Sequence, residues 1–458
     1  MEFWNYNIWD LTIQFGTICL ILLFSNILRR KIGFLRKSFL PTAVIGGFIA
    51  LGLRVGGLLN FIDIQVLNAI TYHALNIGFI ALALKRSYGT EKSKKGSSYK
   101  AGLTIVGTYL LQGVVGLAIT TFVGLIIMPS LFQAAGILLP LGFGQGPGQA
   151  NNFGTIFETQ NGFVGGQSFG LSIASLGFVV ACLVCVIWIN FRIKKKGLIL
   201  RTEKSDLSAS ENINPSDEVP LSEAVDKFTL QIGIVMLVFM LSFLFMWGFD
   251  NLFISSNILG TFGVKTVRPL LWGFNFIFGT LIAMLFKKVF VVLKKKGIAK
   301  REYCNNYILN RISGSVFDFM IIASIALIDP VLLSSTWWVL LIVCGVGAIS
   351  TFFYLQFVCK KQFPDYWVES FMCLYGNLTG TASTGIALLR VVDPNFETPA
   401  STDLVSGSAV AVIFGFPLML LIGLAPSMPW LTLVLLAVFS AFINFLLFYK
   451  KKKKQKTN

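Results

Sequence analysis

Charged residues are scarce in this chain, and histidine is nearly absent. Only 13% of the 458 residues are charged, a single residue is histidine and 55% are hydrophobic, which gives a mean hydropathy of +0.74. This composition supplies too little polar surface for a soluble protein of this length. The sequence also lacks the H-E-x-x-H motif of zinc hydrolases. We therefore expect an all-α polytopic membrane protein that is not an enzyme.

Acidic residues are fewer than basic ones, 21 against 38, and the net charge is +17. The basic residues stand in short runs beside apolar segments, so they indicate membrane topology rather than nucleic-acid binding. The runs lie at residues 29–37, 85–100, 192–201, 287–301, 360–361 and 450–454. The positive-inside rule places them in the cytoplasm. We expect a multi-pass protein of the cell membrane with its N-terminus outside, no cleavable signal peptide and a cytoplasmic C-terminus.

No disulfide framework is expected, because the seven cysteines are an odd number and most lie within apolar segments or at their basic ends. Cys182 and Cys185 form a C-x-x-C pattern inside one such segment, without a second pair of ligands. Packing and metal or redox chemistry both remain open for this pair, and packing is the simpler interpretation. The sequence predicts no resident cofactor.

Apolar segments long enough to cross a bilayer recur along the chain. They lie at residues 11–28, 101–128, 162–191, 228–249, 331–359 and 404–449, the last divided at 425–429. Two glycine-rich interruptions, GFGQGPGQANN at 142–152 and GNLTGTASTG at 376–385, occupy matching places in the two halves. Lipid cannot hydrogen-bond a broken backbone, so such loops persist at membrane depth only when packed in protein or beside water. Paired interruptions of this kind indicate the binding site of a transporter.

Counting crossings predicts that the two interrupted segments are re-entrant hairpins. The span at 101–128 must end outside and the span at 162–191 must end inside, so residues 131–157 cannot also cross. They are expected to enter and leave from outside. The same count of crossings in the second half predicts that residues 371–389 form a hairpin that enters and leaves from the cytoplasm.

Each half then contains four spans, a hairpin and one more span, in opposite orientations. This is an inverted-topology repeat. We expect about 12 spans in all. The predicted parts are a first repeat at 1–191, a cytoplasmic linker at 192–227, a second repeat at 228–425, an extra span at 430–449 and a basic tail at 450–458.

Three short motifs resemble those of a known family. Residues 41–47 read PTAVIGG, where the family opens its second span with P-x-P-V-x-G-G, and residues 143–150 read FGQGPGQA, where it has G-G-H-G-T-G-x-A. The second hairpin keeps the family's glycines at Gly376 and Gly380, with Ser383 in place of its proline. On these residues, over most of the chain, the sequence resembles the sodium/glutamate symporter family.

This resemblance implies an elevator-type secondary transporter: a homodimer whose fixed scaffold holds a moving domain built around the two hairpins. It also implies that sodium, the coupling ion, drives import of glutamate or a similar small anionic amino acid or carboxylate. A proton-coupled or channel-like permease on the same fold is the alternative.

Polar groups at the hairpin tips are the candidate site for substrate and ion, because broken helix ends present free backbone dipoles. At the first tip they are Gly144, Gln145, Gly146, Gly148, Gln149, Asn151 and Asn152, and at the second Gly376, Asn377, Thr379, Gly380, Thr381, Ser383 and Thr384. Sodium is expected at these tips. The other interpretation is that these residues only cap the broken helices.

Asp318 is the sole acidic residue well inside a span, and Asn76 stands at nearly the same place in the first repeat. An ionised carboxyl group at the centre of a span costs about 2.5–3.5 kcal/mol. Cation coupling and a buried hydrogen bond without a transport role are both open for Asp318. The acids Glu158 and Glu397 after the hairpins, Arg390 and His73 also leave structural and functional interpretations open.

Overall fold

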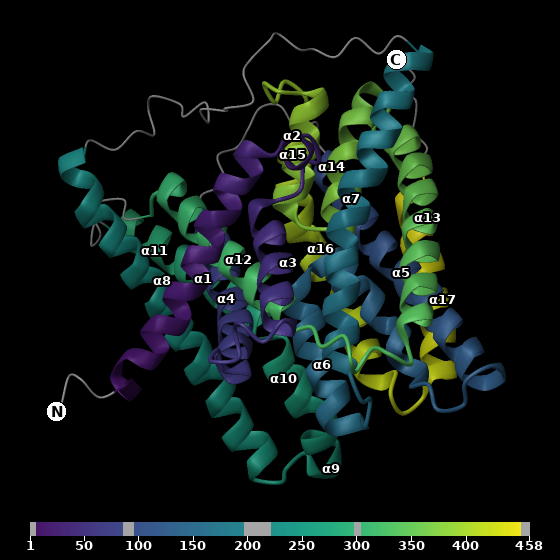
Figure 1. The fold of residues 1–458 in the computed structure, drawn as a ribbon, viewed down its shortest axis with the longest axis horizontal. Coiled ribbons are helices and arrows are strands. Elements are labelled where there is room, and N and C mark those ends of the chain that lie inside the picture. The colour runs from purple at the N-terminus through teal and green to yellow at the C-terminus, as the bar shows by residue number, and fades with distance from the viewer. Residues whose placement is uncertain (1–5, 86–95, 197–220, 297–303, 450–458) are drawn as a thin grey trace.

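The computed structural model describes residues 6–85, 96–196, 221–296 and 304–449. All regular structure in these residues is helical, and ten of their helices are long and apolar enough to cross a membrane. The chain is therefore a multi-pass membrane protein, with its long helices gathered into one bundle (Figure 1). The central part of the expected linker, 197–220, and the tail at 450–458 lie outside the described residues.

The first half contains five long or medium helices before its last one. These are α1 (Tyr6–Lys31), α3 (Thr42–Val55), α4 (Ile64–Leu84), α5 (Ser97–Ile126) and, after a broken segment, α6 (Pro147–Asn161); a short α2 (Gly33–Lys37) follows α1. The last helix, α7 (Gly166–Lys196), begins four residues later than the expected span. The segment at 131–157 is indeed broken: η1 (Gln133–Ile137) and η2 (Pro140–Gln145) precede α6.

The second half follows a similar order. It contains α8 (Leu221–Phe249), α11 (Asn275–Lys295), α12 (Asn306–Ala326), α13 (Trp337–Gln362), α14 (Trp367–Thr379), α15 (Ala382–Val392) and α16 (Ala400–Leu424), and α17 (Pro429–Phe448) ends the described chain. Short turns η4 (Asp250–Ser255), α9 (Gly260–Phe262), η5 (Gly263–Val267) and α10 (Arg268–Gly273) join α8 to α11, and η6 (Pro364–Tyr366) precedes α14.

Side-chain caps and prolines set several helix ends. Asp63 accepts a hydrogen bond from the Gln65 backbone at the start of α4, and Asn305 does the same for Ile308 in α12. The expected span at 331–359 begins later, at Trp337. The preceding residues form turns instead, because Asp329 accepts from the Val331 backbone and Pro330 accepts from the Leu333 backbone.

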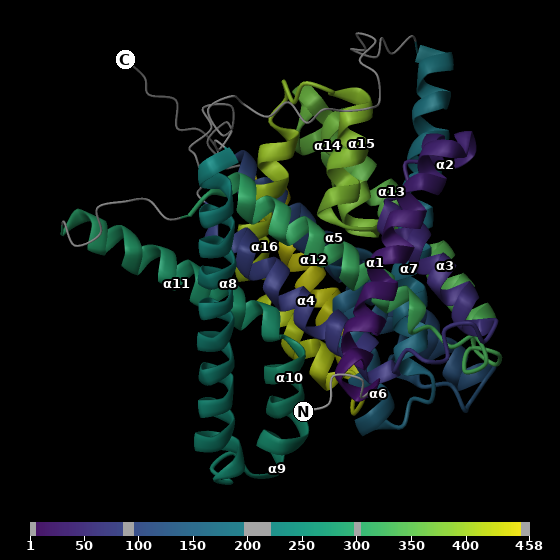
Figure 2. The same cartoon turned by 60° about the vertical axis from the view of Figure 1, so that its left-hand side comes forward.

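The helices form two neighbouring groups. In the first, which we call the scaffold group, α12 packs on α3 and α4, α11 on α4, and α1 and α8 on the outside. In the second, the hairpin group, α5 packs on α13, α16, α17 and η1, while α6 packs on α7 and α14 on α15. Figure 2 shows α8 and α11 on one side and α14 and α15 side by side. Helix α6 also contacts α4, α10 and α12, so it lies at the boundary between the groups.

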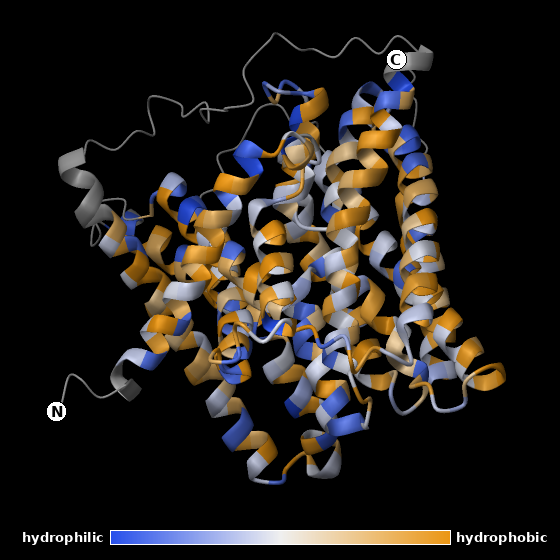
Figure 3. Cartoon of the chain, in the orientation of Figure 1, coloured by the Kyte–Doolittle hydropathy of each residue, from blue (hydrophilic) through white to orange (hydrophobic). Residues whose placement is uncertain are grey.

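Large apolar side chains cover the outside of the bundle. Leu20 of α1, Leu244 of α8, Ile349 of α13 and Phe445 of α17 are all more than half exposed. Hydrophobic residues dominate the long helices in Figure 3, and hydrophilic residues are more frequent toward the ends of the bundle. In water such a surface would drive association, whereas in a bilayer it matches the acyl chains.

A buried hydroxyl–carboxyl cluster fixes the base of the second hairpin. Asp403 of α16 accepts hydrogen bonds from Ser97 Oγ of α5 at 2.5 Å and from Tyr366 OH at 2.6 Å. Burial raises the pKa of Tyr366, and its hydrogen bond to Asp403 raises it further. The phenol therefore stays protonated and able to donate over the physiological pH range.

Replacing Asp403 with alanine should lower the melting temperature of the purified protein by several degrees. Two buried hydroxyl groups would lose their acceptor, and hydrogen bonds of this kind contribute about 0.5–3 kcal/mol each. Thermal unfolding in detergent measures the effect, with Asp365→Ala, at an exposed position, as the control. Equal melting temperatures for both variants would contradict this role.

Candidate substrate site at the hairpin tips

The first hairpin turns at a backbone conformation that favours glycine. Gly146, between η2 and α6, has φ +88° and ψ −177°, a region that side chains avoid. Gly142, one turn earlier, packs against α7 so closely that a Cβ atom there would lie 2.7 Å from Ile173 and 2.9 Å from the Ala174 nitrogen. The glycines seen in the sequence thus allow both a tight turn and close packing.

The second hairpin also depends on glycine at its contact between limbs. A Cβ atom at Gly376 of α14 would lie 2.9 Å from Gly385 of α15, so the two limbs touch through their backbones. Thr381 begins α15 as its N-cap, and its hydroxyl accepts from the Thr384 backbone at 3.4 Å. Part of the threonine content of this tip is therefore used for capping.

The two tips meet. A Cβ atom at Gly146 would lie 3.6 Å from Thr381 Cγ2 and 3.8 Å from the Gly380 carbonyl oxygen. Helix α7 packs against both, because Gly177 contacts Phe143 and the Thr379 carbonyl, and Phe178 contacts Gly380. Segments more than 230 residues apart are thus joined at one point.

Helix α5 holds both hairpins through two side chains. Tyr109 OH donates to the Gly144 carbonyl at 3.1 Å. Gln112 Nε2 donates to the Leu378 carbonyl at 2.8 Å and to Thr351 Oγ1 of α13 at 3.1 Å. The broken backbones of both hairpins are thereby partly satisfied by one neighbouring helix.

Several buried amide atoms near the first tip have no hydrogen-bond partner among the described residues. They are Gln112 Oε1, Gln145 Oε1 and both polar atoms of Gln149, and Gln149 is fully buried. An unpaired buried polar group costs about 1–3 kcal/mol. A bound solute, cation or water that pairs with them would recover this free energy.

A polar stripe on α6 leads away from the tip. Gln149, Asn152 and Thr155 are three residues apart and so share a face of the helix, and each has an unpaired polar atom. Asn152 Nδ2 donates to the Gly273 carbonyl at 2.9 Å, at the break between α10 and α11. We call Gln149, Asn152 and Thr155 the α6 stripe; it lies at the boundary of the two helix groups.

A cavity of about 590 Å³ adjoins the far end of the α6 stripe, between α4, α6 and α10. Asn151, Asn152 and Thr155 of α6 line it together with Tyr72 of α4 and Arg268 of α10. Beside it, Gln167 of α7 donates to Asn151 Oδ1 at 2.8 Å and to Asn68 Oδ1 at 2.5 Å. The candidate site therefore has two parts, the junction of the tips and this cavity, and the α6 stripe lies between them.

The remaining candidates divide into those at the tips and those elsewhere. At the second tip, Asn377, Thr379 and Thr384 are buried, Thr379 Oγ1 donates to the Tyr375 carbonyl at 2.7 Å, and Ser383 is exposed. Gly148 lies at the first tip but packs on Leu75 and Met320 of the scaffold group. The absence of a side chain at Gly148 thus allows the hairpin group to pack closely on the scaffold group.

Asn76 and Asp318 do not join the tips. Asn76 of α4 is buried against Gly279 of α11, and its Oδ1 has no partner among the described residues. Asp318 is partly buried on α12, and the described part of the chain offers it no hydrogen-bond or ion-pair partner. These two residues lie within the scaffold group.

Of the other residues that the sequence left open, Arg390 lies over the Phe396 ring at 5.2 Å, His73 packs between Tyr72 and Phe239, and Glu158 accepts a hydrogen bond from the Gln167 backbone. In the described residues, no three His, Cys, Asp or Glu side chains are grouped as a metal site.

Sequence reasoning missed Tyr109, Gln112 and Arg268. Gln112 offered a signal, since it is an amide in the middle of an otherwise apolar span and such residues need a buried partner. Tyr109 and Arg268 offered none, because an aromatic residue in a span and an arginine near a span end are common. Only packing shows what they contact.

Fold and site together define a helical multi-pass membrane protein in which two broken-helix segments meet inside the bundle. Compared with known proteins, the chain matches no family model and no curated sequence.

Proposed function

We propose that the chain is a secondary transporter that moves a small solute past the meeting point of its two hairpins. The observation that carries the proposal is the contact of Gly146 with Gly380 and Thr381 beside the unpaired amides of Gln145 and Gln149. Irregular backbone within a membrane domain fits a solute pathway. Unpaired buried amides at that point supply groups that a solute can bind.

Helix packing supports an inverted repeat. The second span of each half packs on the third span of the other, α3 on α12 and α11 on α4. The first span of each half also packs on the second span of its own half and on the third span of the other half. Helix α1 contacts α3 and α12, and α8 contacts α11 and α4. Such exchanged pairs are the pattern that a pseudo-twofold axis produces.

An elevator mechanism follows from the two helix groups. Both hairpins pack mainly within the hairpin group, and among the described residues α6 makes the main contacts with the scaffold group, on α4 and α12. Sliding at this boundary would carry the tips across the membrane while α5 keeps them together. The basic segments put the start of α5 and the ends of α7 and α13 in the cytoplasm, and the family resemblance adds a homodimer.

The tips favour a substrate and a coupling ion that neutral oxygens and amides can bind. Gln145, Gln149, Asn377 and Thr381 offer such groups without a fixed charge. Together with the family resemblance, this supports sodium-coupled import of glutamate or a related carboxylate.

Uptake of labelled L-glutamate into proteoliposomes, with and without an inward sodium gradient, tests the function. We expect accumulation that requires the sodium gradient. Uptake that follows a proton gradient alone, or that equilibrates without accumulation, would instead identify the permease alternative. No uptake of any amino acid or carboxylate under any gradient would reject a transporter of these solutes.

Asp318→Asn should weaken the sodium dependence of uptake severalfold. The substitution removes an acidic group that has no partner in the described residues and that is costly within a span. A sodium titration of initial uptake rates measures it, with Asp329→Asn, near the end of the same helix, as the control. An unchanged sodium titration would exclude Asp318 from coupling.

A further inference from the structure

We infer that the cavity between α4, α6 and α10 is an outer recognition site that binds the carboxylate of a solute through Arg268. The inference rests on the proposed function and names the substrate class of that site. A cavity of about 590 Å³ is within the range that encloses small ligands. Tyr72, Trp272 and Ile156 give it apolar walls, and Asn68, Asn152 and Gln160 place amides around them.

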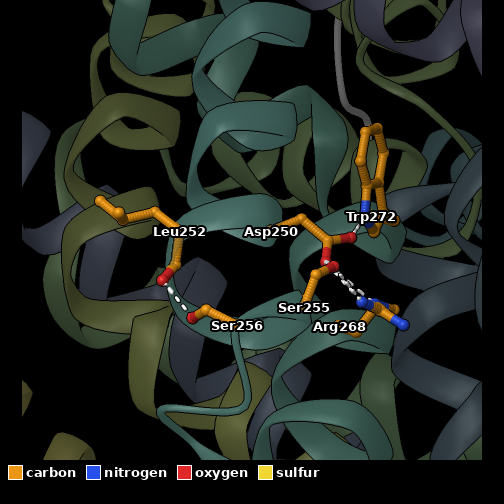
Figure 4. Close-up of polar contacts among 6 residues, drawn as sticks. All are labelled: Asp250, Leu252, Ser255, Ser256, Arg268 and Trp272. Carbon is orange, nitrogen blue, oxygen red and sulfur yellow. Dashed lines mark hydrogen bonds and ion pairs between the residues drawn. The ribbon is translucent and has the colours of Figure 1, made fainter.

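Arg268 is held with part of its guanidinium group free. Its Nε and Nη2 donate to the same oxygen of Asp250, at 3.0 and 2.7 Å, and Nη2 also donates to Ser255 Oγ at 2.9 Å (Figure 4). Trp272 Nε1 donates to the other Asp250 oxygen at 2.8 Å. No described residue pairs with Nη1, and the arginine side chain is 38% exposed.

This arrangement orients the guanidinium group in advance. A fixed arginine loses less conformational entropy when it binds, and its planar donors match a carboxylate. Asp250 offsets the charge of Arg268, so the empty cavity does not carry a bare cation at the edge of the membrane. A carboxylate would then bind through a charge-assisted hydrogen bond to Nη1.

A second observation comes from α6. Asn152 and Thr155 line the same cavity and Asn152 is only 5% exposed, while the buried atoms Asn152 Oδ1 and Thr155 Oγ1 have no partner in the part of the chain that the structure describes. Gln160, which lines the cavity at an exposed position of α6, can pair with the amino group of an amino acid whose carboxylate faces Arg268. The α6 stripe continues from here to Gln149, so its buried polar groups lie between the cavity and the proposed transport site.

The basic runs of the sequence indicate on which side of the membrane the cavity lies. The cavity lies near the start of α10 and the end of α6, and the basic runs place these ends opposite the cytoplasm. The cavity would therefore capture solute before it reaches the hairpins.

Arg268→Gln tests the inference in proteoliposomes by labelled L-glutamate uptake. We expect the KM to rise about tenfold while the maximal rate stays within about twofold. Lys265→Gln is the matched control, since this exposed residue of η5 also loses a positive charge and does not line the cavity. Its KM should equal that of the unmodified protein.

Ala69→Phe provides a second variant that leaves the Asp250–Arg268 pair intact. Ala69 lines the cavity, so a phenyl ring there should fill part of it and also raise the KM. If both variants keep the original KM while the unmodified protein transports glutamate, the recognition site is rejected and the transporter stands. If the unmodified protein moves no carboxylate but accumulates a neutral solute, the inference fails and the transport function survives. Absence of any transport rejects the function itself.

Discussion

Replacing Gly146 with alanine is expected to reduce glutamate kcat/KM by at least about tenfold. With φ +88° and ψ −177°, this residue occupies a conformation that costs a side-chain residue about 1–3 kcal/mol. Relief of that strain would turn the first tip away from Gly380 and Thr381. Initial uptake rates in proteoliposomes measure the loss.

The control for Gly146 is Gly162→Asn at the other end of α6. Gly162 also has a positive φ, +73°, but its ψ of 19° is a left-handed conformation that asparagine tolerates, and nothing lies within 4 Å of a Cβ atom there. Its uptake should be normal. If Gly146→Ala also transports normally, the geometry of the first tip does not determine transport.

Gln149→Leu is expected to raise the melting temperature and to cut uptake by at least about tenfold. The side chain is fully buried, neither of its polar atoms has a partner within the described ranges, and each unpaired group costs about 1–3 kcal/mol. A leucine of similar volume removes that cost and also removes groups available to the solute. Opposite changes in stability and activity are a signature of a binding residue.

Gln112→Leu is the control that shows whether replacing any buried glutamine by leucine raises the melting temperature. Gln112 is equally buried, but its Nε2 makes two hydrogen bonds, to Leu378 and Thr351. This variant should therefore lower the melting temperature. A lower melting temperature for Gln149→Leu, with normal uptake, would show that Gln149 has a structural role.

Much of the architecture could be predicted from local patterns. A backbone in lipid must satisfy its own hydrogen bonds, so an apolar run of sufficient length has to be a helix. The broken segments were visible for the same reason, because GFGQGPGQANN and GNLTGTASTG cannot continue an apolar helix without disruption. Helix ends were less accurate: α13 begins at Trp337 because turns around Asp329 and Pro330 occupy the residues before it.

The candidate site was only partly visible. Glycines and amides at 144–152 were found because they are unusual in a span, and the structure places Gln149 and Asn152 on one helix face. The pattern did not reveal that Asn76 packs against Gly279 of α11, within the scaffold group. An alternating or helical pattern gives the face of a residue within its own helix, whereas its partner depends on which helix packs there.

Composition and local pattern suffice to predict a bundle of membrane-crossing helices with two interrupted segments, because the cost of an unpaired backbone in lipid acts on each segment separately. The contacts of Gly146 with Gly380 and Thr381, of Gln112 with α13 and α14, and of Arg268 with the cavity beside Asn152 come from helix packing alone. These contacts depend on shape complementarity between helices far apart in the chain, and no local pattern encodes it.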